Sequence, residues 1–173
     1  MTHRTAVVVG NPKPGSRTLA AALRVARGLT DEEPQLVVDL ATWGSALLDW
    51  DDPAVADLVA DVAAADLVVV ASPTYKATYT GLLKLFLDRF AAGSLSGVAV
   101  PLMLGAGPAH ALAPQVSLAP LLSHLGAVVP EGLYVLDQHH DDAGAYADWL
   151  ARTRPVAHAL LDRRGGRLAE VPA

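Results

Sequence analysis

The stretch that decides the fold is Ala71-Ser-Pro-Thr-Tyr-Lys-Ala-Thr-Tyr-Thr-Gly-Leu-Leu-Lys-Leu-Phe-Leu-Asp88. In it a fully apolar run, residues 67–71, stops at a turn containing Pro and Tyr, and the chain restarts with the periodicity of a helix. A second turn of this kind, Gly10-Asn-Pro-Lys-Pro-Gly-Ser-Arg-Thr18, follows the apolar run 6–9. Two strand–loop–helix turns that open on one sheet edge predict a crevice for a cofactor.

The alternation of apolar runs and helical patterns predicts the rest of the architecture. Five runs have the Val and Leu content of buried parallel strands: residues 5–10, 35–40, 67–72, 98–104 and 132–137. Helices are expected over 16–29, with Ser16 as N-cap, and over 52–64, 80–90, 109–125 and 142–162. The pattern predicts an α/β three-layer sandwich, flavodoxin-like, with a five-stranded parallel sheet of order 2-1-3-4-5. We expect one domain, residues 1–164, and a disordered tail, residues 165–173.

Composition limits the classes of function. A chain of 173 residues with 52% hydrophobic content can bury the core of one compact domain. No apolar run reaches the ~20 residues of a membrane span, and the first residues lack a signal-peptide pattern, so a cytoplasmic protein without membrane contact is expected. The net charge of −5 argues against nucleic acid as a partner. Because the chain has no Cys, redox chemistry would need a bound cofactor.

The first loop, residues 10–18, has the chemistry of a phosphate cradle. Asn11, Ser16 and Thr18 offer short polar side chains, and Lys13 and Arg17 offer positive charge. They lie at an expected helix N-terminus, where unpaired N–H groups and the helix dipole favour an anion. A capped turn with incidental basic residues is the alternative. A Walker A loop is excluded because its Lys is missing, and the G-x-G-x-x-G dinucleotide fingerprint is absent here.

The second loop, residues 72–80, suits a flat ring rather than a phosphate. Pro73 and Tyr75 supply rigid apolar surface, while Ser72, Thr74 and Lys76 supply few hydrogen-bond donors. A simple turn with a surface Tyr is the alternative interpretation.

The third loop, residues 105–110, follows the fourth strand and is expected beside the second loop. Gly105, Ala106 and Gly107 would let the backbone approach a ligand closely, and His110 could contact a ring or a phosphate or simply cap a helix. The neighbouring His139 and His140 do not predict a metal site, because adjacent loop residues rarely share one ion. No G-x-S-x-G elbow supports a hydrolase triad.

These loops together resemble those of the NADPH-dependent FMN reductase family. The first loop is similar to the family's G-S-x-R-x-x-S-x-(S/T) pattern, with Asn11 in place of the first Ser and Lys13 in place of the Arg. Residues 72–84 are similar to the signature P-x-Y-x-x-(S/T)-x-(S/T)-G-x-(L/F)-K, and residues 105–110 resemble the Gly-rich third loop. The resemblance is greatest to flavin reductases that feed two-component sulfonate monooxygenases.

The resemblance implies an oxidoreductase that passes hydride from NADPH or NADH to N5 of FMN. It implies that residues of the three loops bind the cofactor, that no side chain acts as general acid or base, and that no metal takes part. It further implies a flavin-dependent monooxygenase or another acceptor as partner. A homodimer or homotetramer is predicted from the residues, because the helical segments 80–90 and 109–125 are apolar on more than one face and one small domain has only a shallow crevice. Some sulfonate-linked relatives carry an inserted aromatic residue in the fourth helix, which is associated with a flavin that is released as a substrate at a tetramer interface. This chain has no aromatic residue between His110 and Gly126, so release and retention of the reduced FMN both stay open. An FMN-bound quinone, azo-dye or chromate-type reductase and an electron-transfer flavodoxin stay open as alternatives.

Overall fold

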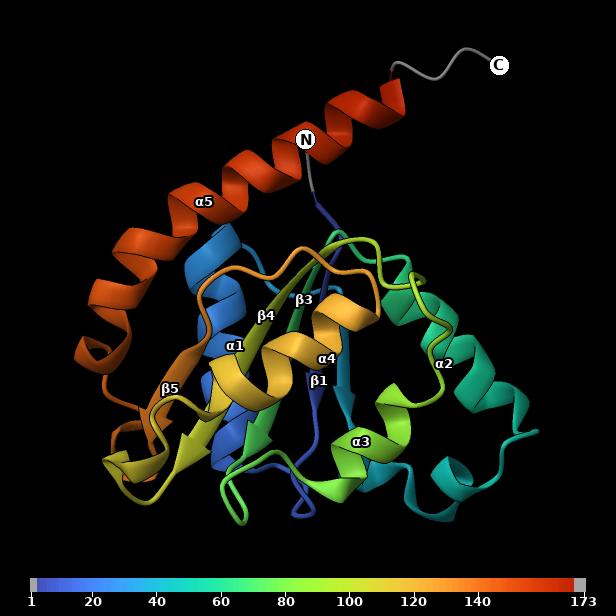
Figure 1. Ribbon diagram of the computed structural model, residues 1–173, viewed down its shortest axis with the longest axis horizontal. Coiled ribbons are helices and arrows are strands. Elements are labelled where there is room, and N and C mark those ends of the chain that lie inside the picture. Colours follow the sequence, from blue (N-terminus) through green and yellow to red (C-terminus); the bar gives the residue numbers. More distant parts are fainter. Residues whose placement is uncertain (1–2, 170–173) are drawn as a thin grey trace.

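The sheet has the predicted order. The computed structural model describes residues 3–169. Five parallel strands lie in the order β2-β1-β3-β4-β5 (Figure 1). Their bounds are β1 Thr5–Val9, β2 Leu36–Asp39, β3 Leu67–Pro73, β4 Val98–Gly105 and β5 Leu133–Leu136. Because parallel strands need long crossovers, each strand is followed by helical structure, and the flavodoxin-like arrangement is confirmed.

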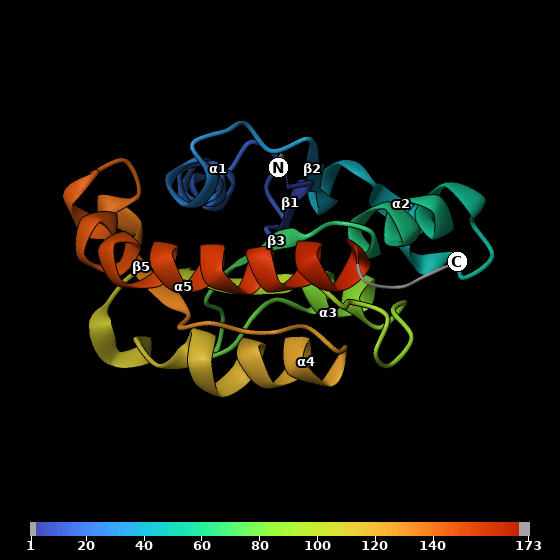
Figure 2. The same cartoon turned by 90° about the horizontal axis from the view of Figure 1, so that it is seen from above.

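Helices cover both faces of the sheet, as Figure 2 shows from above. One face carries α1, Arg17–Thr30, and α5, Gly144–Ala169. The other carries α2, Pro53–Ala63, α3, Gly81–Leu87, and α4, Ala119–His124. The shorter elements are η1 Leu40–Thr42, η2 Gly44–Leu48, η3 Pro108–His110, η4 Pro114–Leu118 and η5 Asp137–His139.

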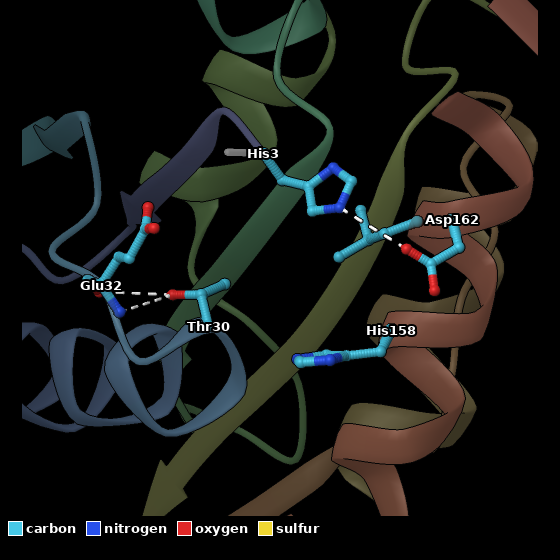
Figure 3. A pocket seen from close by; sticks show the side chains of 6 residues that line it. His3, Thr30, Glu32, His158 and Asp162 are labelled. Atoms are coloured by element: carbon cyan, nitrogen blue, oxygen red, sulfur yellow. Dashed lines mark hydrogen bonds and ion pairs between the residues drawn. The ribbon is translucent and has the colours of Figure 1, made fainter. Parts of the chain in front are cut away.

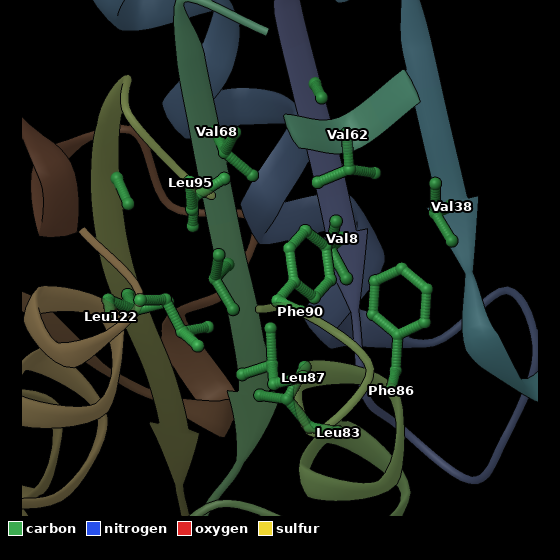
Figure 4. Close-up of a cluster of buried hydrophobic side chains, with 14 of the residues drawn as sticks. Val8, Val38, Val62, Val68, Leu83, Phe86, Leu87, Phe90, Leu95 and Leu122 are labelled. Atoms are coloured by element: carbon green, nitrogen blue, oxygen red, sulfur yellow. The ribbon is translucent and has the colours of Figure 1, made fainter. Parts of the chain in front are cut away.

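The strands divide the core into two clusters because successive side chains point to opposite faces. Val7 and Val9 pack with α1 and α5, whereas Val8 packs with α2, α3 and α4. In the cluster that contains Val8, the rings of Phe86 and Phe90 meet edge to face at 5.4 Å between centroids (Figure 4). The β3 strand is buried along its whole length, which explains its continuous apolar sequence.

Three helices differ from the prediction. The helix predicted over 80–90 is α3, which ends at Leu87. The segment predicted as one helix over 109–125 is instead η3, a turn, the π-helix η4 and only then α4. The Ala119 N–H bonds to the Pro114 carbonyl, which widens the helix. In the last helix, α5 continues to Ala169 and so extends into the segment predicted as disordered; residues 170–173 lie outside the described residues.

The stability of the protein at high pH depends on Tyr146, a buried residue of α5. Its side chain is 1% exposed and its hydroxyl donates to the His140 carbonyl at 2.7 Å. Burial raises the pKa of Tyr146 to about 12 from 10.0; the stacked Arg24 lowers that pKa in part and Asp141 raises it. Because the folded pKa is the higher one, this stabilisation is complete below pH 10 and is lost as pH rises toward 12.

We therefore expect the free energy of unfolding to fall between pH 10 and pH 12 by up to about 2 to 3 kcal/mol through this group. Urea unfolding of the wild type and of Tyr146→Phe across this range measures the effect. The variant loses the hydrogen bond at every pH but should show a shallower decline above pH 10. Parallel declines of the two proteins would contradict the assignment.

Candidate functional site

The three loops of interest meet at the carboxyl edge of the sheet, the lower edge in Figure 1. The first loop follows β1, the second follows β3 and the third follows β4, and these three strands are neighbours in the sheet. In open α/β sheets this edge is where ligands bind. The structure thus brings together the three loops in which the predicted cofactor residues lie.

Internal hydrogen bonds shape the first loop. The Asn11 amide donates to the Thr18 hydroxyl at 2.9 Å, and its oxygen accepts from the Lys13 N–H at 2.9 Å. Ser16 is the N-cap of α1, and its hydroxyl oxygen accepts from the Leu19 N–H at 3.3 Å. The side chains of Asn11 and Thr18 are therefore already engaged with the loop itself. The hydroxyl proton of Ser16 remains available to a ligand, because capping uses only its oxygen.

The electrostatics of the first loop favour an anion. Lys13 and Arg17 are exposed, and neither forms an ion pair within the described part of the chain. Arg17 is the first residue of α1 and Lys13 lies three residues before its N-cap, and the helix dipole adds partial positive charge at this end. Asp39 opposes them in part, since its carboxylate accepts from the Gly15 N–H at 2.9 Å and so holds the loop to the end of β2. Two cations against one carboxylate leave a net positive site.

The second loop ends in a small exposed hairpin. The backbones of Tyr75 and Thr78 pair in both directions, at 2.9 and 3.2 Å. Between them Lys76 and Ala77 have φ of 53° and 68°, a left-handed conformation that L-residues with a Cβ rarely adopt. Tyr75 is 54% exposed, although it is a large aromatic residue. Strained backbone and an uncovered ring at a loop tip are typical of ligand-binding sites.

A buried hydrogen-bond chain joins the second loop to the first. The Thr80 N–H donates to the Ser72 hydroxyl at 3.0 Å, and Ser72 in turn donates to the Pro73 carbonyl at 2.8 Å. The Thr80 hydroxyl donates to the Gly10 carbonyl at 2.5 Å. Ser72, predicted to bind a cofactor, is 0% exposed. Its side chain therefore acts on the site through Thr80 and the backbone.

Tyr134, on β5, fixes the third loop. Its hydroxyl donates to the Gly107 carbonyl at 2.7 Å. A Cβ at Gly105 would lie 2.0 Å from that hydroxyl, so a side chain at this position would displace Tyr134. Burial raises the pKa of Tyr134, the charge of Asp137 raises it further, and the nearby Thr74 hydroxyl lowers it.

The remaining predicted residues of the second and third loops differ in their exposure and in their hydrogen bonds. The Thr74 hydroxyl is buried beside Tyr134 but makes no hydrogen bond of normal geometry with the described residues. A Cβ at Gly107 would meet open space, and Ala106 and His110 are exposed. The Thr74 N–H donates to the Leu104 carbonyl at 2.6 Å, which fixes the base of the second loop against β4.

Sequence reasoning missed Thr80, Tyr134 and Asp39 as residues that build the site. Thr80 had a local signal, since it precedes a helix as an N-cap does. Asp39 is the last residue of β2 and lies at the same sheet edge, a position that could have been noted. Nothing local marked Tyr134, whose role depends on its pairing with β4.

A separate small pocket lies at the opposite edge of the sheet. It has a volume of about 190 Å³ and is lined by His3, Thr30, Glu32, His158, Leu161 and Asp162 (Figure 3). The His158 ring contacts the Leu29 carbonyl at 2.6 Å, so the pocket is part of the junction between α1 and α5. Among the described residues no group of His, Asp and Glu could hold a metal ion. None of the described helices combines the length and the apolar character that crossing a membrane requires.

Comparison with known proteins identifies similar sequences. The family model described as "NADPH-dependent FMN reductase" matches residues 3–141. An FMN reductase (NADPH) of Pseudomonas aeruginosa is 33% identical over 174 residues, which cover 94% of this chain and 92% of that protein. An FMN reductase (NADPH) of Escherichia coli is 39% identical over 98 residues, and this alignment covers 53% of this chain and 51% of that protein.

A solved structure shares most of the fold. The apo form of an NADH:FMN oxidoreductase (EMOB) superposes with a TM-score of 0.82 at 28% sequence identity. The superposition covers 92% of this chain and 90% of that one.

Proposed function

The chain belongs to the NADPH-dependent FMN reductase family and is an NAD(P)H-dependent oxidoreductase that reduces FMN; from this premise we propose how its residues serve the reaction. Hydride transfer from nicotinamide to N5 is chemistry that the flavin supplies when it is bound. The protein binds and orients the two ring systems and keeps water away from them. No side chain is assigned as general acid or base.

The first loop fits the phosphate group of FMN. Lys13 and Arg17 are unpaired cations within the described part of the chain, and Ser16 has a free hydroxyl proton. This pair of unpaired cations at the start of α1, beside a loop with an uncovered ring, is the observation that carries the proposal. Lys13 contributes charge without the bidentate geometry of an Arg. Asn11 and Thr18 hold the loop in shape through their mutual hydrogen bond.

The second and third loops fit the flavin ring. Tyr75 offers a flat apolar surface to one side of a planar ring, and Lys76 lies at the tip of the same hairpin. Pro73 is buried at the end of β3, so we expect it to support the loop beneath the ring. The Thr74 hydroxyl is buried beside Tyr134, so we expect Thr74 to shape the base of the second loop beneath the ring. Beyond them, Gly107 leaves open space, and Ala106 and His110 lie on the exposed surface of the third loop.

The same geometry serves a released flavin or a tightly held one. The π-helix η4 begins at Pro114, a short turn after the third loop, and no aromatic residue lies between His110 and Gly126. A released flavin would supply a partner monooxygenase, whereas a held flavin would favour direct reduction of a quinone-type acceptor. We favour release of the reduced flavin, because all three loops are open at the sheet edge. We also propose that the reaction takes place in the cytoplasm.

We further propose a homo-oligomer, at least a dimer, that covers the open side of the site. Leu112 and Val116 are 71% and 66% exposed just after the third loop, and Tyr75 is 54% exposed in the second. Apolar surface of this kind beside a binding site is typical of an interface. Sedimentation at low micromolar concentration should give at least twice the 18.0 kDa chain mass. A monomer that reduces FMN at full rate would show that a second subunit is unnecessary.

Anaerobic stopped-flow mixing tests the function. Protein is mixed with excess FMN and either NADPH or NADH, and the loss of oxidised-flavin absorbance is followed. We expect many FMN molecules reduced per protein chain. Reduction limited to one protein-held flavin, followed by rapid turnover with a quinone, would favour the acceptor-reductase alternative. No faster loss than in the protein-free mixture would refute the assignment.

A further inference from the structure

Thr80 connects two loops that would otherwise be independent. It is 5% exposed and is the N-cap of α3, where its hydroxyl oxygen accepts from the Leu83 N–H at 3.1 Å. The same hydroxyl donates its one proton to the Gly10 carbonyl, across 70 positions of sequence. Its backbone N–H is held by the buried Ser72 hydroxyl. Thr80 therefore does more than cap a helix, because its proton is directed at the first loop.

The Gly10 carbonyl matters because of the peptide to which it belongs. The peptide bond is planar and trans, so the Gly10 carbonyl and the Asn11 N–H point in opposite directions. When Thr80 holds the carbonyl, the Asn11 N–H points away from α3. On the other side, the Gly10 N–H is held by the Ala71 carbonyl at 2.8 Å. Both ends of Gly10 are thus anchored to β3 and α3, which also position the second loop.

We propose that Thr80, held by Ser72, is a positioning residue for the phosphate of FMN. It fixes the Gly10–Asn11 peptide so that the Asn11 N–H, the start of α1 and the two cations present donors to one phosphate. The inference rests on the proposed function, since it assumes that FMN binds in the first loop. If the inference holds, the affinity for the phosphate depends on Thr80, a buried residue at the end of the second loop.

The alternative role of Thr80 is structural. An N-cap stabilises its helix whether or not a ligand is present, so loss of the cap would lower the stability of the protein. A structural role would change the binding of FMN and of riboflavin equally, because the two ligands share the ring and differ in the phosphate. The proposed role predicts a loss that is selective for FMN.

The test compares dissociation constants for FMN and for riboflavin, measured by quenching of flavin fluorescence. Thr80→Val keeps the shape but removes the hydroxyl. We expect its dissociation constant for FMN to rise about tenfold or more, and that for riboflavin to rise less than about threefold. Thr80→Ser keeps the hydroxyl and should restore FMN selectivity. Thr153→Val is the matched control, because the Thr153 hydroxyl is also buried but makes no hydrogen bond with the described residues.

Each outcome decides the question. If Thr80→Val keeps the wild-type ratio of the two constants, the inference is wrong and the proposed function stands. If the wild type binds neither flavin, the proposed function fails and the inference fails with it. Should Thr80→Val not fold, Ser72→Ala replaces it, since that variant removes the acceptor of the Thr80 N–H. The same selective loss is then expected, and an unchanged ratio overturns the inference.

Discussion

Replacing Ser16 and Arg17 together by Ala is expected to weaken FMN binding by about 2 to 4 kcal/mol, which is roughly a 30- to 1000-fold rise in the dissociation constant. The double variant removes a hydroxyl donor and a cation from the start of α1, where neither is needed to pair with another described side chain. Titration of the apoprotein with FMN measures the change.

Loss of the cap alone must be separated from loss of the phosphate contacts. Ser16→Ala also removes the acceptor for the Leu19 N–H, which costs stability of α1. Asp52→Ala is the matched control, because Asp52 caps α2 by accepting from the Ala54 and Val55 N–H groups. That variant should lose similar stability and keep its FMN affinity. An unchanged dissociation constant for FMN in the double variant would refute the phosphate site.

The fold was predictable because its signals are local. Continuous apolar runs mark strands that are buried on both faces, and the run that ends at Ser72 lies in a strand buried throughout. Ser16 was predicted as an N-cap and Asp52 as the start of a helix, and both accept hydrogen bonds from the first turn of their helices. The strand order is the flavodoxin-like one expected for five strands that alternate with helices. Each of these features depends on residues close in sequence or on a general rule of chain connection.

The features that sequence reasoning missed depend on distant contacts. Gly105 lacks a side chain because Tyr134, on the neighbouring strand, occupies that space. Thr80 reaches Gly10 only because β1 and β3 are neighbours in the sheet. The π-helix at Pro114 also escaped prediction, since helical periodicity does not distinguish it from an α-helix over one turn. Which loops would meet was thus predictable, but not how they are tied together.

Gly10→Ala should produce the largest loss of stability, because there is no room for a side chain where β1 ends. A Cβ at Gly10 would lie 2.3 Å from the Leu83 Cβ and 3.0 Å from the Leu83 Cα. These atoms belong to the base of a helix residue and cannot rotate away, so α3 must move from the sheet. Overpacking of this kind costs typically 1 to 3 kcal/mol, and we expect at least about 2 to 3 kcal/mol here.

Gly81→Ala, one residue into the same helix region, is the control for this prediction. A Cβ at Gly81 meets nothing within 4 Å, and Gly81 begins α3 with ordinary helical conformation. Because Ala restricts the unfolded chain more than Gly does, this variant should be neutral or more stable by up to about 1 kcal/mol. Urea unfolding of both variants gives the comparison. Displacement of α3 in Gly10→Ala would also pull Thr80 from the Gly10 carbonyl, so FMN affinity should fall together with stability. Equal stability of the two variants would mean that α3 does not pack on the first loop as closely as the structure shows.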